Sequence, residues 1–585
     1  MVTPADANDA ARRGRLAPWL GVPVGVLASL VGVVLLLDPF RSLAVLVVGV
    51  VAALVLLGVG DLAAAWRSGG GWWRWVTGAV WLAAAVAVLA WPGPTVRVLA
   101  FAAGVAAVLV GVRRLLAGVR GHDEQRVTAV LLGASATAAG VLLLAWPDVT
   151  VFVVAVACGA TLVVQGLARA REAVRPRARP ERRSRGRRLA RTGGAVASVL
   201  VLALLVSGTV ALHRATPVPD AFYTPPATVP GQPGRLLRSE PFSRGMPAGT
   251  HAWRILYTTT RDTGVPAVAS GLVLVGDQAP AGPRPVIAWA HGTTGFARQC
   301  APTLLADPLG AGAMPALGDV ISHGWALVAT DYAGLGTAGP HPYLVGQAEG
   351  RSVLDAVRAA RQLAGVTLSD ETVVWGHSQG GHAALWTAIL RPTYAPDVPL
   401  RGVAALAPAT DLPALVRNLD QLSVGSLFAA YAVAAYSQVY PDVRFDDVVR
   451  PGARVQVHEM ADRCLSEPSI VVSVLHALLF RQTILAGGAP DGPFVRRLAQ
   501  NVPTGPVTAP VLVAQGEADP LVLPAMQRAY VAARCADGWS IDYRTYPGLD
   551  HTGLVADSSP LVPQLVAWTA ARFAGQPAAS TCPGA

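Results

Sequence analysis

The chain has 585 residues, a mean hydropathy of +0.44 and only 14% charged residues. Soluble domains carry about a quarter charged residues, so this composition argues against a purely soluble protein. The high hydrophobicity excludes disorder as the main state. The formal net charge of +11 has three possible explanations: binding to nucleic acid, binding to an anionic membrane surface, or a signal for membrane topology. The position of the charge along the chain distinguishes them.

Division of the chain at Ala215 separates two parts of different charge. Residues 1–215 hold 23 Arg against 9 acidic residues, net +14, and residues 216–585 hold 24 Arg against 27, net −3. The first part consists of apolar stretches, each near the ~20 residues that cross a bilayer as a helix. We therefore expect seven transmembrane helices, at about 18–37, 43–60, 75–91, 95–112, 127–146, 149–168 and 193–212.

The arginines orient this bundle. Twenty of them lie on one side of the expected membrane, and only Arg41, Arg97 and Arg214 lie on the other. The positive-inside rule makes the first side, with the N-terminus, cytoplasmic, and an odd number of spans places everything after them outside the cytoplasm. The run 169–191 holds 11 Arg, which we interpret as part of this topology signal. We expect no nucleic-acid partner.

The apolar stretches also repeat. The dipeptides Asp38-Pro39, Trp91-Pro92 and Trp146-Pro147 separate paired stretches, with the prolines 53 and 55 residues apart, which indicates three tandem helical hairpins. The pattern resembles the HdeD-type (DUF308) family of small bacterial membrane proteins over about residues 18–170. It implies an all-α membrane bundle. The expected order is a six-span membrane domain (1–168), an arginine-rich cytoplasmic linker (169–191) and a seventh transmembrane helix (192–214).

The remainder of the chain reads as a spacer and an α/β domain. Residues 215–235 are rich in proline and predict an extended spacer. Over residues 236–585, short apolar runs that resemble strands alternate with helical patterns. This alternation predicts a mostly parallel sheet covered by helices.

The sharpest motif of this domain is GHSQG, at 376–380, between the strand-like TVVW and the helix-like HAALWTAIL. A serine between two glycines at a strand-to-helix turn is typical of a nucleophile elbow, where a strained turn holds the hydroxyl clear of the backbone. Ser378 is therefore the candidate nucleophile.

A nucleophilic serine needs a base and an acid, in the chain order Ser, Asp or Glu, His for this kind of fold. Asp519 follows the strand-like run at 511–514, and His551 lies in the later loop PGLDHTG. Glu517 and Asp550 are the alternatives for the acid. The other histidines considered are His377, expected to point elsewhere from the tight elbow, His382, expected on a helix face, and His458 and His476, in a later insertion.

The oxyanion needs two preorganised N–H donors. One is expected from the backbone of Gln379, the residue after the serine. The other is expected from HGTTG, at 291–295, which follows the strand-like PVIAWA. We favour the N–H of Thr293, with Thr294 as the alternative.

The segments HGTTGFARQCAP, TDYAGLGTAGPHPYLVG, GHSQGGHAA, QGEADPLV and DHTG together resemble the secretory lipase family of α/β-hydrolases, over roughly residues 220–574. The resemblance implies an α/β-hydrolase fold, hydrolysis of acyl esters that include triacylglycerols, and the roles of Ser378, Asp519 and His551 as nucleophile, acid and base. It also implies a helical cap after a strand that ends at Leu406, which we place at about 411–506.

The cysteines fit an exported domain. Cys158 lies within an expected span, and the other four lie in the second part, an even set for an oxidising compartment. Four cysteines allow three pairings, of which we favour Cys300 with Cys464 and Cys535 with Cys582; reduced buried thiols are the alternative. We see no metal-binding cluster and expect no cofactor.

These features predict a multi-pass protein of the cell membrane whose extracytoplasmic domain is a serine hydrolase of lipase or carboxylesterase type. Its expected partners are a lipid or acyl-ester substrate and the bilayer, and the sequence does not predict an oligomeric state. The alternatives are an acyltransferase with the same three residues and an inactive envelope stress or interaction protein.

Overall fold

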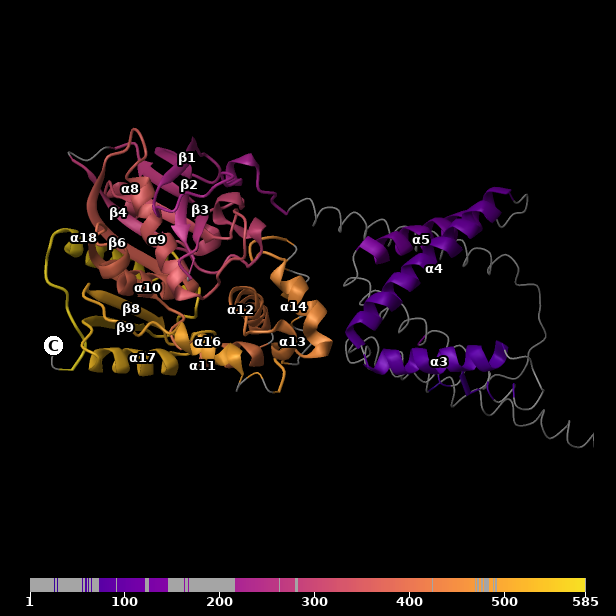
Figure 1. The fold of residues 1–585 in the computed structure, drawn as a ribbon. Helices are drawn as coiled ribbons and strands as arrows, with labels where there is room; N and C mark the ends of the chain where they lie inside the picture. Colours follow the sequence, from indigo (N-terminus) through magenta and orange to yellow (C-terminus); the bar gives the residue numbers. More distant parts are fainter. Residues whose placement is uncertain are drawn as a thin grey trace, which may run out of the picture. The chain divides into compact units, whose positions relative to one another are not determined.

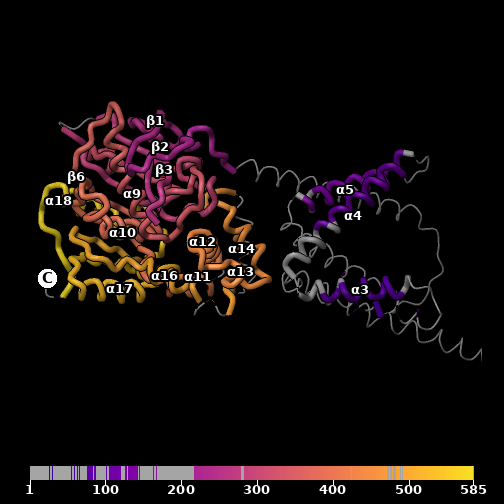
Figure 2. Tube along the Cα trace, viewed as in Figure 1, coloured from indigo at the N-terminus to yellow at the C-terminus, as the bar shows by residue number. Residues whose placement is uncertain are grey.

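The computed structural model describes residues 73–90, 92–120 and 126–145, isolated positions between 26 and 167, and residues 216–583 apart from 262, 279–281, 423 and part of 469–491. The chain divides into two compact units, Met1–Ala211 and Leu212–Ala585 (Figures 1 and 2). Apart from isolated positions, several expected features lie outside the described residues. These are the spans at 18–37, 43–60, 149–168 and 193–212, the linker 169–191, Cys158 and His476.

Three helices of the first unit coincide with expected spans. They are α3 (Trp73–Ala90), α4 (Pro92–Arg120) and α5 (Arg126–Ala145). Helix α4 starts on Pro92, where the missing N–H of proline costs no hydrogen bond. Among the described residues, none of the helices qualifies as long and apolar enough to cross a bilayer.

Helices α4 and α5 pack together through glycines. Gly104, Gly111 and Gly118 recur every seven residues on α4 and face α5. A Cβ on Gly111 would lie 2.4 Å from the backbone nitrogen of Thr137, and one on Gly140 would lie 2.7 Å from the carbonyl oxygen of Gly104. The absence of side chains at these positions therefore lets the two backbones touch, as in many membrane helix pairs.

The second unit is built on one nine-stranded sheet, with the order β1-β2-β3-β5-β4-β6-β7-β8-β9. The first two strands and β3 form antiparallel pairs, β3 is antiparallel to β5, and the remaining pairs are parallel. The strands are β1 (Leu236–Pro241), β2 (Thr250–Thr260), β3 (Pro266–Gly276), β4 (Arg284–Ala290), β5 (Ala326–Ala333), β6 (Leu368–His377), β7 (Leu400–Leu406), β8 (Val511–Gly516) and β9 (Ile541–Tyr546).

Helices cover both faces of this sheet. One face packs against α9 (Gly346–Ala360), α10 (Gln379–Tyr394) and α17 (Pro524–Ala536), and the other against α8 (Leu317–Ser322) and α18 (Leu561–Phe573). The parallel strands are apolar on both sides: on β6, Val374 belongs to the core under α9 and α10, whereas Val373 and Trp375 belong to the core under α18. A sheet buried on both faces produces such continuous apolar runs.

A helical insertion follows β7, which ends at Leu406. It contains α11 (Leu412–Gln421), α12 (Gly425–Val439), α13 (Phe445–Val448), α14 (Arg454–Ala461) and α16 (Pro493–Gln500). We call the segment 411–506 the cap. Helix α12 is apolar on almost all sides and buried along most of its length, because the other cap helices and the loop at Tyr343 and Leu344 pack around it. Figure 1 shows the cap helices beside the sheet domain, in orange.

The segment expected to be an extended spacer is packed on the sheet domain over much of its length. Phe222 and Tyr223 are buried, and the Tyr223 hydroxyl lies 2.9 Å from Thr303 Oγ1. The guanidinium of Arg254 lies 4.2 Å from the centre of the Phe222 ring. The proline content predicted an extended spacer, whereas the segment contains a short 3-10 helix at Ala221–Tyr223, whose two aromatic residues give it an apolar surface to bury.

Candidate active site

The strand-to-helix turn at Ser378 has the strained geometry of an elbow. Ser378 has φ +56° and ψ −116°, a region that costs a non-glycine residue about 1–3 kcal/mol. The flanking glycines have no room for a side chain: a Cβ on Gly376 would lie 2.0 Å from the carbonyl oxygen of Gly380, and one on Gly380 would lie 1.8 Å from that of Ala290. The turn thus places a half-buried serine at the carboxyl end of β6.

Parallel pairing brings the other candidate residues to the same edge of the sheet. Ala290, the last residue of β4, pairs with Gly376, so the loop that begins at His291 starts beside the elbow. Strands β8 and β9 end together, with Gly516 paired to Tyr546, and the loops that carry Asp519 and His551 follow them.

Asp519 and His551 form a buried hydrogen-bonded pair. The Nδ1–H of His551 donates to Asp519 Oδ2 over 2.7 Å. The other carboxylate oxygen accepts the backbone N–H groups of Leu521 at 2.9 Å and Val522 at 3.0 Å, and Gln515 Nε2 donates to Oδ2 over 3.0 Å. These bonds fix the carboxylate, and the carboxylate in turn fixes the tautomer of the imidazole, with its Nε2 unprotonated.

The competing acids are placed differently. Glu517 is exposed, and Asp550 is exposed and accepts the N–H of Gly553 at 2.7 Å. The carboxylate that the structure brings to His551 is therefore that of Asp519.

The expectation for His377 was wrong. Its buried ring does not point away from the site but packs against His551, with ring centres 4.7 Å apart, and its Nε2–H donates to the carbonyl oxygen of His551 over 3.0 Å. Burial, and then the neighbouring His551, lower the pKa of His377 to about 3. A neutral His377 therefore supports the backbone of His551 without adding a positive charge beside it.

The remaining histidines have other surroundings. His382 is fully buried, as a residue on a helix face, and bonds Glu349 and the backbone of Asn501. His458 is exposed on α14 and stacks on Phe445, with ring centres 4.2 Å apart. Neither ring contacts Ser378, whereas His551 lies against His377, the neighbour of Ser378.

The loop HGTTG and the start of α10 supply the candidate oxyanion donors. Gln379 is the first residue of α10, where the N–H groups are free of helical partners and the helix dipole favours negative charge. Thr293 is half-buried, with its Oγ1 3.0 Å from the Tyr343 hydroxyl. Thr294 is fully buried and donates to the carbonyl of Cys300, so Thr293 is the threonine nearer to solvent, as Ser378 is.

Two disulfides have the pairing that we favoured, Cys300 with Cys464 and Cys535 with Cys582. The first joins the segment after HGTTG to the cap. Beside it, the N–H of Leu465 donates to the carbonyl of Thr294 over 2.8 Å. The cap is thus attached directly to the candidate oxyanion loop.

Several ionisable groups of this unit are buried without a full counter-charge. Burial lowers the pKa of His291 to about 4 and that of His341, like His377, to about 3. Burial raises the pKa of Asp331 and of Asp355 to about 6. Within the described part of the chain, no group of three or more His, Cys, Asp or Glu side chains is arranged to hold a metal ion.

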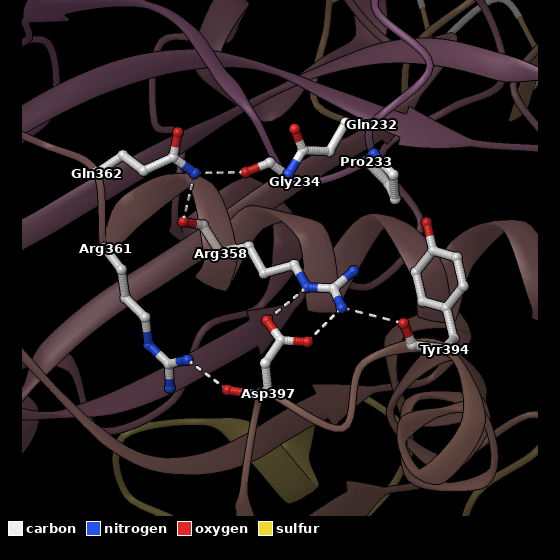
Figure 3. A pocket seen from close by; sticks show the side chains of 8 residues that line it. All are labelled: Gln232, Pro233, Gly234, Arg358, Arg361, Gln362, Tyr394 and Asp397. Carbon is white, nitrogen blue, oxygen red and sulfur yellow. Dashed lines mark hydrogen bonds and ion pairs between the residues drawn. The ribbon is translucent and has the colours of Figure 1, made fainter.

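A polar cavity of about 450 Å³ lies elsewhere in this unit (Figure 3). Its lining includes Arg358, Arg361 and Asp397, and Arg358 forms an ion pair with Asp397. Gln362, just after α9, donates its Nε2–H to the carbonyl of Gly234 over 2.6 Å, which holds the end of the 215–235 segment there. The arginines and Gln362 come just before β6 in the chain, and Asp397 comes just before β7, so they lie at the amino ends of these strands. The elbow lies at the carboxyl end of β6, so the cavity is separate from the candidate active site.

Known proteins resemble both parts of the chain. The secretory lipase family model matches residues 313–581, and the model of a short repeat of unknown function (DUF308) matches three times, at 23–90, 76–140 and 131–206. Lipase 6 of Candida albicans is 24% identical over an alignment of 400 positions that covers 63% of this chain and 83% of the relative. Lipase A of Moesziomyces aphidis is 26% identical over an alignment of 400 positions that covers 63% of this chain and 84% of the relative. The chain is a carboxylic-ester hydrolase.

The fold agrees with this identification. The crystal structure of Candida antarctica lipase A in its closed state has a TM-score of 0.54 and 20% identity, over 63% of this chain and 89% of that one. The second unit of the hydrolase therefore has an α/β-hydrolase-like fold, as predicted. The N-terminal part carries tandem repeats, as the proline spacing predicted.

Proposed function

We propose that this hydrolase is a membrane-anchored serine lipase or esterase in which Ser378 is the nucleophile, His551 the base and Asp519 the acid. The observation that carries the proposal is the buried 2.7 Å hydrogen bond from His551 to Asp519, in a loop held against the elbow at Ser378 by His377. The chain order and the roles are those of the serine-histidine-acid triad on an α/β-hydrolase scaffold.

The mechanism follows from this geometry. His551 Nε2, unprotonated because Nδ1 carries the proton, accepts the hydroxyl proton of Ser378 as Oγ attacks the ester carbonyl. The N–H groups of Thr293 and Gln379 stabilise the oxyanion of the tetrahedral intermediate. His551 then returns the proton to the leaving alcohol, and an acyl-enzyme remains. Water, deprotonated by His551, attacks the acyl-enzyme, and His551 returns that proton to Ser378 Oγ as the acid is released.

The membrane anchor is supported by the surfaces of the N-terminal helices. Large apolar side chains of α3, α4 and α5 are exposed, with Val86, Phe101 and Leu109 each 64% exposed, whereas the described part of the hydrolase unit exposes only Val218, Val265 and Val424. Monomeric soluble proteins rarely expose apolar surface of this extent. With the arginine distribution, this supports helices in a bilayer, a cytoplasmic N-terminus and an extracytoplasmic catalytic unit, where disulfides are stable.

The substrate we propose is an acyl ester that resides in or near the same membrane. The expected seventh span ends at residue 214, and Phe222 is already buried in the hydrolase unit. Eight residues reach at most about 28 Å, so the catalytic unit stays close to the bilayer surface. The lipid esters of the envelope lie within that reach.

Hydrolysis by purified full-length wild-type and Ser378→Ala protein tests the catalytic proposal. With a p-nitrophenyl ester, we expect Ser378→Ala to lose at least about 10³-fold in kcat with an unchanged melting temperature. Equal rates would refute the role of Ser378. Acylated acceptor in place of free acid would identify an acyltransferase.

The proposed orientation of the chain in the membrane is tested with Val218→Cys, because Val218 is 81% exposed. In intact cells, a membrane-impermeant maleimide is expected to label Val218→Cys and to leave a cysteine at Arg177, in the arginine-rich segment, unlabelled until the cells are lysed. The reverse pattern would contradict the proposed topology.

A further inference from the structure

A second carboxylate–histidine pair lies beneath the elbow, between α9 and α10, which pack side by side (Figure 1). Glu349, on α9, is fully buried. Its Oε1 accepts the side-chain Nε2 of Gln379 at 2.7 Å and the N–H of Leu344 at 2.9 Å, and its Oε2 lies 3.0 Å from His382 Nδ1. The carboxylate therefore bonds the side chain of the residue whose backbone is the candidate oxyanion donor.

The hydrogen bonds of His382 define how the pair is held. Its Nε2–H donates to the carbonyl of Asn501, 2.8 Å away, so a further proton must lie between Nδ1 and Glu349 Oε2. Asn501 follows α16 at the end of the cap, and its side chain bonds the N–H of Gly346 and the Tyr440 hydroxyl. A backbone group thus holds each member of the pair: the carbonyl of Asn501 holds His382, and the N–H of Leu344 holds Glu349.

The amide orientation of Gln379 is equally determined. Its Nε2 also lies 3.1 Å from Nε2 of His341, whose Nδ1 is 3.2 Å from the carbonyl of Ala333. Because that carbonyl only accepts, His341 carries its proton on Nδ1 and accepts at Nε2. Both neighbours of the amide group are acceptors, so Gln379 donates one hydrogen to each, and the side chain has one orientation.

We propose that Glu349 is a positioning residue for the oxyanion: its bond to the Gln379 side chain, braced by His382, holds the Gln379 N–H toward the substrate carbonyl oxygen. This assignment rests on the proposed function of Ser378. A donor in an oxyanion hole is effective only at the distance of the developing charge, and small displacements have large effects on the rate. Without the bond from Gln379 Nε2 to Glu349, the Gln379 side chain loses its anchor, and its backbone N–H is held less firmly toward the substrate carbonyl oxygen.

Glu349→Met tests the proposal, because it keeps the length of the side chain and removes both oxygens that accept hydrogen bonds. We expect kcat to fall by about tenfold or more, with KM within about twofold. The affinity for a trifluoromethyl ketone, whose adduct with Ser378 carries an oxyanion, should fall by the same factor as kcat/KM. A merely structural role would lower the melting temperature without this split.

Asp355→Leu is the matched control. Asp355 lies on the same helix, is fully buried and accepts hydrogen bonds from Thr259 Oγ1 and the Tyr394 hydroxyl, but has no bond to the elbow. We expect this variant to lose stability and to keep its kcat. An unchanged kcat in folded Glu349→Met, or an equal fall in both variants, would overturn the proposal.

If Glu349→Met does not fold, Gln379→Met distinguishes the two outcomes. It retains the backbone N–H and removes the side-chain amide, and we expect the same fall in kcat and in ketone affinity; full activity would overturn the proposal. The proposed function is judged separately by Ser378→Ala. An inactive Ser378→Ala beside a fully active Gln379→Met would refute the role of Glu349 alone.

Discussion

Replacement of Asp519 by asparagine changes which ring nitrogen of His551 carries the proton. In the wild type, Asp519 Oδ1 accepts two backbone N–H groups and Oδ2 accepts His551 Nδ1–H and Gln515 Nε2. An asparagine that keeps the two backbone bonds must direct its NH₂ group at His551. That group donates, so Nδ1 must accept, and the proton of the neutral ring moves to Nε2.

A His551 protonated on Nε2 cannot take the proton of Ser378. In a serine protease, this change of tautomer lowers kcat by about 10⁴, which corresponds to about 5.5 kcal/mol of transition-state stabilisation. We expect a loss of this order for Asp519→Asn in the hydrolysis of a p-nitrophenyl ester, with little change in KM.

Asp550→Asn is the control for this experiment, since Asp550 precedes His551 but is exposed and bonds the N–H of Gly553. It should retain activity within a few fold. A loss of less than tenfold in Asp519→Asn, or a larger loss in Asp550→Asn, would refute the assignment of the acid.

Three further predictions concern stability and the cap. The three buried histidines with lowered pKa favour proton uptake on unfolding below about pH 6.5, and the two buried aspartates with raised pKa oppose it in part. Stability should therefore fall as the pH is lowered from about 6 to 4, and His341→Gln should make that fall shallower in urea unfolding. Gly380→Ala should abolish ester hydrolysis because its Cβ would lie 1.8 Å from a carbonyl oxygen, whereas Gly452→Ala, which meets nothing within 4 Å, should behave as wild type. Removal of the disulfide by Cys300→Ser and Cys464→Ser opens a loop of 164 residues and should cost about 5 kcal/mol of stability, seen as a lower midpoint in denaturant. A midpoint equal to that of wild type would show that the cap is held without it.

The local signals at the catalytic edge could be read from the sequence. Glycines on both sides of Ser378 are required by contacts within a few residues and by the neighbouring strand, and a strand followed by a helix is visible as a change of periodicity. The loop positions of Asp519 and His551 follow from the ends of two parallel strands.

Other features depend on contacts that sequence spacing does not contain. The role of His377 depends on a loop 174 residues away, and the burial of Glu349 depends on the packing of α9 against α10. From the sequence, Glu349 and His382 are expected on exposed helix faces, because the packing of the two helices is not known. The docking of the spacer had a local signal, the adjacent aromatic residues Phe222 and Tyr223, which the high proline content outweighed.

Covalent labelling of Ser378 tests the central claim most directly. A membrane-impermeant fluorophosphonate, applied to intact cells that express the full chain, should modify one serine, and peptide mass spectrometry should locate the adduct on Ser378. Labelling should disappear together with ester hydrolysis in Ser378→Ala and fall strongly in Asp519→Asn. An adduct on another residue, or no adduct in wild-type protein that hydrolyses esters, would contradict the account.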